Sequence, residues 1–231
     1  MEDWRDRTIK LIGKDKVNTL DNSNIIVFGV GGVGGFAIEG LVRAGVGSIT
    51  IVDNDVVSVS NINRQIIATN STIGKDKTEV MKQRISDINP NAKVNAIKEF
   101  VTPQNIEKFN LKQYDFVVDA IDNITAKIAL AKYAEDNGIN IISCMGTGNK
   151  VCPEKFEIAD IYKTSVCPLA KVMRRELKER GVKHLTVLYS KEQPFADNSS
   201  RTPASISFSP SIAGLRIAEY VIKQIIIQNY E

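Results

Sequence analysis

The sequence predicts an α/β fold with a mostly parallel sheet, helices on both faces and a C-terminal strand and helix extension. The main observation is a strand, glycine turn, helix and strand over residues 25–53. Further apolar runs of strand length then alternate with amphipathic helical patterns. With 231 residues and 43% hydrophobic content, the chain can bury one good core. We therefore expect a single domain with N-terminal helix 1–22, core 23–150 and C-terminal extension with a crossover loop 151–231.

The first unit opens with an apolar strand, Ile25 to Phe28, and a glycine-rich turn follows directly. Gly29, Gly31 and Gly34 satisfy the spacing G-x-G-x-x-G, and Gly32 adds a fourth glycine. Glycine lets the backbone adopt positive φ and approach a phosphate closely. The helix that begins at Gly34 would point free N–H groups at an anion.

The second strand, Ser48 to Val52, brings Asp53 about twenty residues after the glycines. A carboxylate there can accept hydrogen bonds from ribose hydroxyls, so this Rossmann-like core is predicted to bind an adenine nucleotide. The spacing fits an NAD-dependent oxidoreductase at least as well as any other class. A glycine turn without a ligand is the structural alternative.

The remaining elements follow from periodicity and from their start and stop signals. Before the first strand, Trp4 to Leu20 predicts one helix or two short ones interrupted at Gly13. After the second strand we expect a helix from Lys77 to Ile88, a strand Val94 to Ile97, a short helix starting at Thr102-Pro103, a strand Tyr114 to Asp119, a helix Thr125 to Asn137 and a strand Ile139 to Ser143.

The C-terminal extension is predicted as strands Phe156 to Ile161, Thr186 to Tyr189 and Ser205 to Phe208 with helices Pro168 to Arg180 and Pro210 to Tyr230. The polar run from Ser190 to Pro203 is expected to be a lid or disordered. Mixed charge signs on the helix of residues 168–180 favour a solvated face over an RNA-facing one.

Polar side chains follow the predicted strands at the edge where open α/β sheets bind ligands. The segment after Asp53 contains Asp55, Asn61, Arg64 and Gln65, of which the arginine could hold a polyphosphate. The alternative is a surface loop with a solvated arginine.

Lys77 lies in the first turn of its helix, where a cation opposes the helix dipole, so a phosphate partner is one explanation. Asp119 and Asp122 end another strand, and the period of two points them in different directions. This pattern suits one metal ligand and one structural or capping carboxylate. The loop from Cys144 to Lys150 should face the same crevice.

Composition narrows the function classes. A net charge of +3 allows a nucleic-acid partner without arguing for one. Cys144, Cys152 and Cys167 form no C-x-x-C pair, which removes the sequence signal for structural zinc. We expect reduced thiols, a cytoplasmic location and no membrane span. The single histidine, His184, gives no indication of histidine acid–base chemistry.

The order of six features resembles that of the ubiquitin-activating-enzyme-like (ThiF-type) adenylating superfamily. These features are an N-terminal helix with an arginine, the glycine turn, Asp53, the N-x-x-R-Q motif of residues 61–65, a helix that begins with a lysine, and D-x-x-D-N at residues 119–123. Within that superfamily, the chain is most similar to the bacterial tRNA threonylcarbamoyladenosine dehydratases. The closer match lies in Arg7-Thr8 with Leu11 to Gly13, Ser60 to Gln65, Asp87 to Pro90, Met145 to Lys150 and Ala159 to Thr164.

The resemblance implies a role for each matching residue. Gly31 and Gly32 would lie along ATP, and Asp53 would hold the ribose. Arg64 and Lys77 would hold the phosphates, and Asp122 would lie by Mg²⁺. Arg7 would reach across a homodimer into the partner's site.

The implied reaction is adenylation of the threonyl carboxylate of threonylcarbamoyladenosine, in the anticodon loop of tRNA, followed by ring closure with net loss of water. A monovalent cation is an additional cofactor that the resemblance allows. Relatives that activate sulfur-carrier proteins bind zinc through two C-x-x-C pairs, which this sequence lacks. Their absence argues against that branch and for the tRNA-modifying one. Activation of a ubiquitin-like or sulfur-carrier protein, with such a carrier as partner, is kept as the alternative, and an NAD-dependent oxidoreductase is a more remote one. Cys167 as a transfer nucleophile is a further alternative to a packed thiol.

Overall fold

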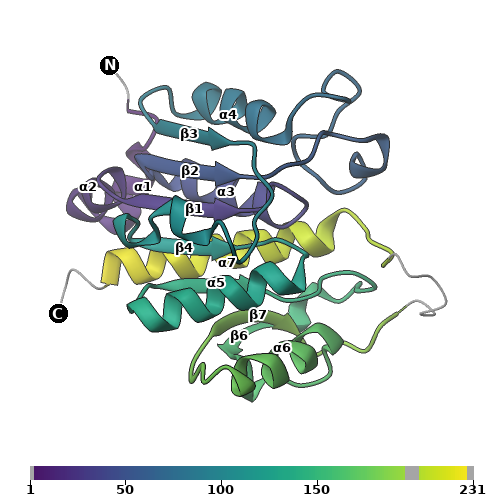
Figure 1. Cartoon of the computed structure of the whole chain (residues 1–231). Helices are drawn as coiled ribbons and strands as arrows, with labels where there is room; N and C mark the ends of the chain where they lie inside the picture. Colours follow the sequence, from purple (N-terminus) through teal and green to yellow (C-terminus); the bar gives the residue numbers. More distant parts are fainter. Residues whose placement is uncertain (1–2, 196–202, 228–231) are drawn as a thin grey trace.

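The computed structural model describes residues 3–195 and 203–227. Within these residues, seven strands form one sheet in the order β3-β2-β1-β4-β5-β7-β6 (Figure 1). All neighbouring strands are parallel except β6 and β7, so the predicted mostly parallel sheet is confirmed. The strands are β1 Asn24–Phe28, β2 Ser48–Val52, β3 Lys93–Ile97, β4 Phe116–Asp119, β5 Ile141–Cys144, β6 Phe156–Asp160 and β7 Thr186–Ser190.

Helices cover both faces of the sheet, as predicted. Helices α3, α4 and α7 share one hydrophobic core with the sheet, and α5 and α6 pack on the other face. The longest, α7, packs against α3. The helices are α1 Asp6–Ile12, α2 Lys14–Asp21, α3 Gly34–Ala44, α4 Lys77–Ile88, α5 Ile124–Asn137, α6 Pro168–Glu179 and α7 Phe208–Ile227.

Strand β1 is apolar on both sides because both of its sides are covered. Ile25 and Val27 join the core that contains α3 and α7, whereas Ile26 and Phe28 join the core beneath α5. There Phe28 meets Phe109 edge to face, with ring centroids 5.1 Å apart. This two-sided burial explains the continuous hydrophobic run that marks the strand in the sequence.

The carboxyl ends of the central strands are in register. Phe28, the last residue of β1, pairs with Val52 on one side and with Asp119 on the other. From β1 the chain moves outward through β2 to β3, and it then returns to β4 on the other side of β1. This reversal makes the carboxyl edge of β1 the switch point where doubly wound sheets bind ligands. The polar residues that follow β1, β2 and β4 therefore meet at one place.

Two predicted elements are wrong. No helix starts at Pro103, because Asn105 closes a turn instead: its Oδ1 accepts a hydrogen bond from the Thr102 N–H (2.8 Å) and its own N–H bonds the Thr102 carbonyl. Two short 3₁₀ helices follow this turn, Ile106–Phe109 and Leu111–Gln113.

Residues 205–208 do not form a strand either. The Ala204 N–H donates to Asn149 Oδ1, and the Ser205 carbonyl accepts from Asn63 Nδ2 at 3.1 Å, so the segment is bonded to side chains of two loops. Helix α7 already begins at Phe208.

At the N-terminus, the break predicted at Gly13 is confirmed: its φ of 89° separates α1 from α2. Part of the predicted lid, residues 196–202, and the predicted end of the last helix at Tyr230 lie outside the described residues. Among those described, no helix is both long and apolar enough to cross a membrane.

Candidate nucleotide-binding site

The glycine turn after β1 is tightly packed against its neighbours. Gly29 has a φ of 91°, and a Cβ there would lie 2.7 Å from the Ala120 carbonyl oxygen. A Cβ on Gly34 would lie 1.8 Å from the Gly29 carbonyl oxygen, far inside contact distance. Side chains are therefore excluded at both positions, and the start of α3 is held against the end of β1.

A cavity of about 690 Å³ opens beyond the carboxyl ends of the strands, beside this turn. It gathers nearly all of the residues predicted to bind the nucleotide. They are Gly29, Gly31, Gly32, Asp53, Asp55, Asn61, Arg64, Gln65, Lys77 and Asp122. Of the predicted set, Gly34 serves the packing of the turn and is not part of the lining, and Arg7 is also outside it.

Asp53 organises the floor of the cavity. Its Oδ2 accepts a hydrogen bond from the Val30 N–H at 2.7 Å, and its Oδ1 accepts one from the Asp55 N–H at 2.8 Å. Each carboxylate oxygen can accept a further bond, so these contacts leave acceptor capacity for hydroxyl groups of a ligand. The carboxylate joins the glycine turn to the segment after β2.

Lys77 has a local partner that the sequence did not indicate. Its Nζ lies 2.7 Å from Asp55 Oδ2, and the lysine is only 5% exposed. The Lys77 N–H also donates to the Asp55 carbonyl. The lysine is therefore aimed into the cavity from the start of α4 while an ion pair holds it in place.

Arg64 and Gln65 come from the loop that crosses the cavity. Arg64 Nη1 donates to the Ser60 carbonyl at 2.7 Å and to Asn63 Oδ1 at 2.9 Å, which holds one edge of the guanidinium against the loop. Gln65 is buried, and within the described residues its Oε1 has no hydrogen-bond partner. A buried oxygen without a partner on a cavity wall fits a ligand donor such as a hydroxyl group.

The two carboxylates after β4 separate as predicted. Asp122 is exposed and lines the cavity, whereas Asp119 is fully buried. Asp119 Oδ2 accepts hydrogen bonds from Lys127 Nζ at 2.9 Å and from Ser143 Oγ at 2.5 Å. This network ties β4, α5 and β5 together, and the helix cap is supplied by Asn123, whose Oδ1 accepts from the Ala126 N–H.

The rest of the cavity lining is partly predicted and partly new. The loop after β5 was expected to face the crevice and does so, through Cys144 to Gly148. Phe100 and Val101 follow β3 and form an apolar wall, which the rule of meeting strand ends could have indicated. Leu169 of α6 and Pro210 of α7 reach the cavity through tertiary packing, and no local pattern marks them.

Arg7 is exposed on α1 and is not part of the cavity lining. Helix α1 lies toward the amino ends of the central strands, whereas the cavity opens beyond their carboxyl ends (Figure 1). The neighbouring Arg5 pairs with Asp21 at the end of α2, next to the amino end of β1. A single chain therefore does not bring Arg7 to the nucleotide cavity.

The cysteines are poorly suited to nucleophilic chemistry. Burial raises the pKa of the Cys144 thiol to about 12, and Cys167 is only 2% exposed. Burial also raises the pKa of Cys152. The described residues contain no group of three or more His, Cys, Asp or Glu side chains that could hold a metal ion by themselves.

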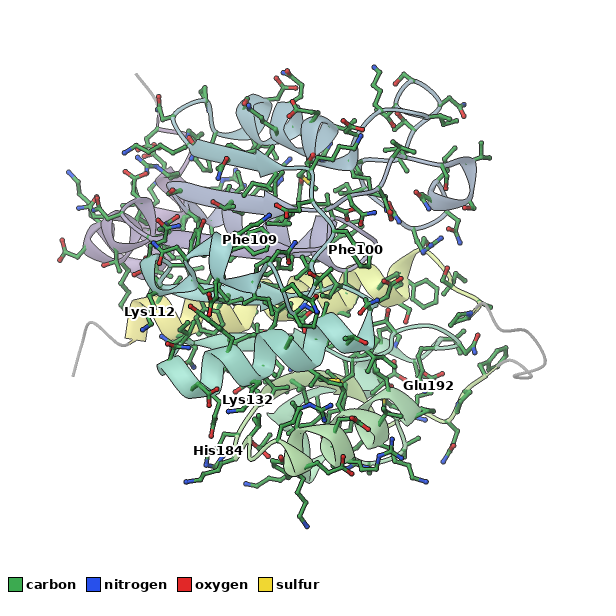
Figure 2. All side chains as sticks on the ribbon, in the orientation of Figure 1. Phe100, Phe109, Lys112, Lys132, His184 and Glu192 are labelled. Atoms are coloured by element: carbon green, nitrogen blue, oxygen red, sulfur yellow. The ribbon has the colours of Figure 1, made fainter. Side chains whose placement is uncertain are left out.

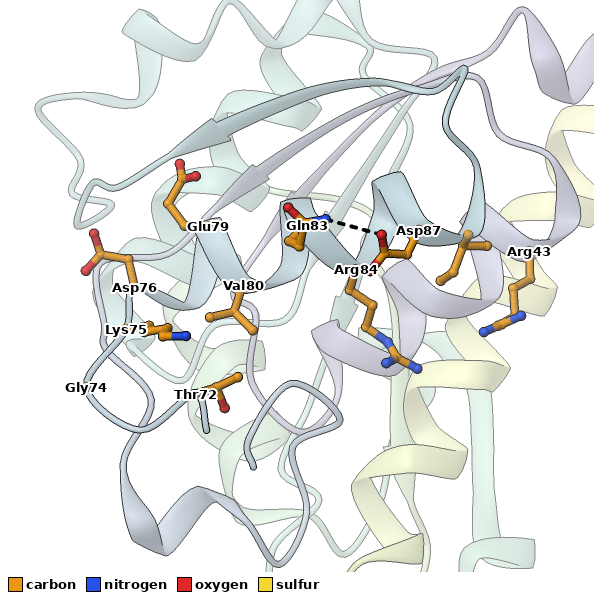
Figure 3. Close-up of a pocket in the computed structure, with 11 residues that line it drawn as sticks. Arg43, Thr72, Gly74, Lys75, Asp76, Glu79, Val80, Gln83, Arg84 and Asp87 are labelled. Carbon is orange, nitrogen blue, oxygen red and sulfur yellow. Dashed lines mark hydrogen bonds between the residues drawn. The ribbon is translucent and has the colours of Figure 1, made fainter. Parts of the chain in front are cut away.

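A second cavity, of about 780 Å³, lies outside this edge, along α4 (Figure 3). Arg84 and Arg43 flank it at one end, and Asp76 and Glu79 lie toward the other. It contains no residue of the glycine turn and no strand end. The switch-point cavity is therefore the candidate nucleotide site.

The strand order, the glycine turn and the switch-point cavity together define a doubly wound α/β protein that binds its ligand beside a helix N-terminus. The family model described as "ThiF family" matches residues 5–229. The chain belongs to the ThiF family.

Relatives and solved structures agree with that assignment. The chain is 42% identical, over 93% of its length and 91% of the relative's, to tRNA threonylcarbamoyladenosine dehydratase of Bacillus subtilis. It is 40% identical to the Escherichia coli enzyme of that name over 76% of this chain, but the match spans only 66% of the relative. Crystal structures of E. coli tRNA N6-threonylcarbamoyladenosine dehydratase in complex with AMP and with ATP match at a TM-score of 0.92 and 32% identity, covering 98% of this chain and 96% of theirs.

Proposed function

We propose that this chain is an ATP-dependent tRNA threonylcarbamoyladenosine dehydratase. It adenylates the threonyl carboxylate of threonylcarbamoyladenosine in tRNA and then closes a ring with net loss of water. The similarity to enzymes of that name supports the substrate. The observation that carries the proposal is the meeting of Arg64, Lys77 and Asp122 in one cavity beside the glycine turn.

The cavity residues fit ATP. Lys77 and Arg64 supply fixed positive charge for the phosphates, and the partnerless Gln65 Oε1 and the free acceptor capacity of Asp53 suit hydroxyl donors. The apolar wall of Phe100 and Val101 suits an adenine ring.

Asp122 is the residue that would hold Mg²⁺. This ion is commonly bound through one or two carboxylates together with substrate phosphates and water, so one exposed aspartate at the cavity suffices as the protein's contribution. When bound, the ion would neutralise charge on the phosphates. A monovalent cation is an additional proposed cofactor, for which we assign no ligand.

The first step needs charge stabilisation and no histidine. The substrate carboxylate attacks the α-phosphorus of ATP, the bond to the β-phosphate oxygen breaks, and pyrophosphate leaves. Negative charge grows on the α-phosphoryl oxygens and on the leaving group. Lys77 and Arg64, already held by Asp55 and the Asn63 loop, can stabilise that charge without reorganising.

The second step is intramolecular. A nucleophilic atom of the same modified nucleoside attacks the activated carbonyl, AMP leaves, and a ring closes. Because the reacting groups belong to one molecule, their effective concentration is high. The step requires no cysteine, in keeping with the burial of Cys144 and Cys167.

A homodimer would complete the site. Arg7 is remote from its own cavity, so it can contribute only to a partner's. The large apolar side chains of Trp4 and Leu11, before and after Arg7 in the sequence, are 47% and 83% exposed, so a partner subunit docked on α1 would cover them. A tRNA substrate also supports a cytoplasmic location.

Two tests bear on the proposal. ATP with Mg²⁺ should raise the thermal unfolding temperature, whereas NAD should not, because a ligand stabilises the state that binds it. Pyrophosphate should be released with tRNA that carries threonylcarbamoyladenosine and not with the same tRNA lacking it. Release that depends instead on the C-terminal tail of a small carrier protein would replace this proposal with the carrier-activating alternative.

A further inference from the structure

The segment that contains α6 is the most basic part of the molecule. Residues 161–184 carry seven Lys and Arg side chains against two Glu, a net charge of +5, although the whole chain has only +3. The remainder of the protein is therefore slightly acidic. α6 itself carries four Lys and Arg side chains against Glu176 and Glu179, so its net charge is also positive. Such a net positive charge in one segment favours a polyanion partner, in contrast to the solvated face that the mixed signs alone predicted.

Part of this charge is used within the protein. Glu176 pairs with Arg175 at 2.7 Å and with Arg180 at 2.9 Å, and Arg174 Nη1 donates to the Thr164 carbonyl at 3.0 Å. By contrast, Lys171 and Lys178 are exposed and form no ion pair with any described residue. These two lysines are free to neutralise charge on another molecule.

The free lysines share one face of α6. Lys171, Arg175 and Lys178 are spaced four and three residues apart, so they lie along one side of a helix about 18 Å long. We call these three residues the α6 basic face. The buried side of α6 carries Ala170, Met173 and Leu177, so the basic face must point outward.

The α6 basic face starts beside the nucleotide cavity. Leu169, in the first turn of α6, lines that cavity, and Lys171 follows two residues later on the outward side. The helix then runs away from the cavity along α5 (Figure 1). If the nucleoside bound in the cavity is part of a long polyanion, the phosphate backbone next to that nucleoside would therefore lie within reach of the α6 basic face.

We infer that the α6 basic face binds the phosphate backbone of the tRNA substrate and so anchors it while the modified nucleoside enters the cavity. This inference rests on the proposed function, which supplies the polyanion. Contacts between lysine and phosphate give affinity and orientation without reading sequence. They also make the affinity depend on salt, by a slope of about 0.7–0.9 per phosphate neutralised.

The test is a Lys171→Ala/Lys178→Ala double variant compared with a Lys93→Ala/Lys112→Ala control. The control removes the same charge from two exposed lysines at the amino ends of parallel strands, Lys93 at the start of β3 and Lys112 shortly before β4. Figure 2 labels Lys112, at the opposite end of the sheet from the cavity. In the α6 variant, tRNA affinity should fall about tenfold and the salt slope should decrease by about 1.5. The KM for tRNA should rise while kcat and thermal stabilisation by ATP stay unchanged.

Equal tRNA affinity and equal salt slope in the α6 variant, the control and the wild type would overturn the inference. An acidic protein would then be the better candidate partner for the α6 basic face. If the wild-type protein binds tRNA but produces no dehydrated nucleoside in it, the proposed function is refuted, whereas the inference about α6 is not. In that case the binding comparison, made with unmodified tRNA, still decides whether α6 holds RNA.

Discussion

At the scale of single residues, the proposed function depends on cations that the fold fixes before a ligand arrives. Lys77 is buried and paired with Asp55, so its position in the cavity costs no side-chain ordering when phosphate binds. Lys75, two residues earlier, is exposed and outside the cavity lining. The sequence places Lys77 in the first turn of the helix and Lys75 just before it, and the structure adds that Lys77 is buried.

Lys77→Ala should therefore lower the rate of pyrophosphate release by about a hundred- to a thousand-fold, as expected for the loss of one preorganised donor. Lys75→Ala is the matched control and should keep wild-type activity. The comparison is made with modified tRNA under saturating ATP. Equal activities of the two variants would refute the role of Lys77.

At the scale of elements, a buried network fixes the strand ends that support Asp122. Asp119, Lys127 and Ser143 connect β4, α5 and β5, and the exposed fraction of each is 1% or less. The predicted division between a buried structural aspartate and a cavity-facing one was possible because the period of two separates their directions. The identity of the partner, Lys127, required the structure, since it lies on the following helix.

Lys127→Ala should destabilise the protein by about 3–5 kcal/mol, because it leaves the Asp119 carboxylate buried without its counter-charge. Lys132→Ala on the same helix removes only a surface pair with Asp136 and should cost less than about 1 kcal/mol. Urea unfolding measures both. Similar losses in the two variants would contradict the importance of the buried network.

A second buried carboxylate joins α3 to α4. Glu39 is 7% exposed, with Oε2 2.6 Å from Arg84 Nε and Oε1 2.7 Å from Arg43 Nε. Burial alone would raise the pKa of Glu39, but the bonds to the two arginines hold it below its ordinary value of 4.5. Since the folded pKa is depressed, the stabilisation is complete above that ordinary value and is lost as the pH falls through the lowered pKa.

Glu39→Gln should thus lower the free energy of unfolding at pH 7, and the difference from wild type should shrink as the pH falls below about 4.5. Glu79→Gln, on the exposed side of α4, is the control and should show little effect. Urea unfolding at a series of pH values gives the comparison. A difference that stays constant down to pH 3 would exclude the proposed titration of Glu39.

At the scale of the whole molecule, the sequence predicted the sheet, most helix ends and the strand-end residues of the cavity, because local periodicity and glycine spacing determine them. It did not predict Leu169 or Pro210, which reach the cavity from elements that begin more than a hundred residues after the glycine turn. It also misplaced residues 102–105 and 205–208, where side-chain hydrogen bonds from Asn105, Asn63 and Asn149 override the local pattern.

The remote position of Arg7 leads to a prediction about assembly. Arg7→Ala and Asp122→Ala should each abolish turnover, but mixed subunits should regain about a quarter of wild-type activity. Half of the dimers are then mixed, and each has one site with both residues intact. The measurement is pyrophosphate release after the two variants are unfolded together and refolded. No recovery in mixtures that do form dimers would refute the cross-subunit role.

The most direct test of the central claim is the mass of the nucleoside product. tRNA carrying threonylcarbamoyladenosine is incubated with the protein, ATP and Mg²⁺, digested, and compared with the same tRNA incubated without ATP. The account predicts a nucleoside lighter by one water only when ATP is present. An unchanged nucleoside with an active, ATP-binding protein would contradict the proposed dehydratase function.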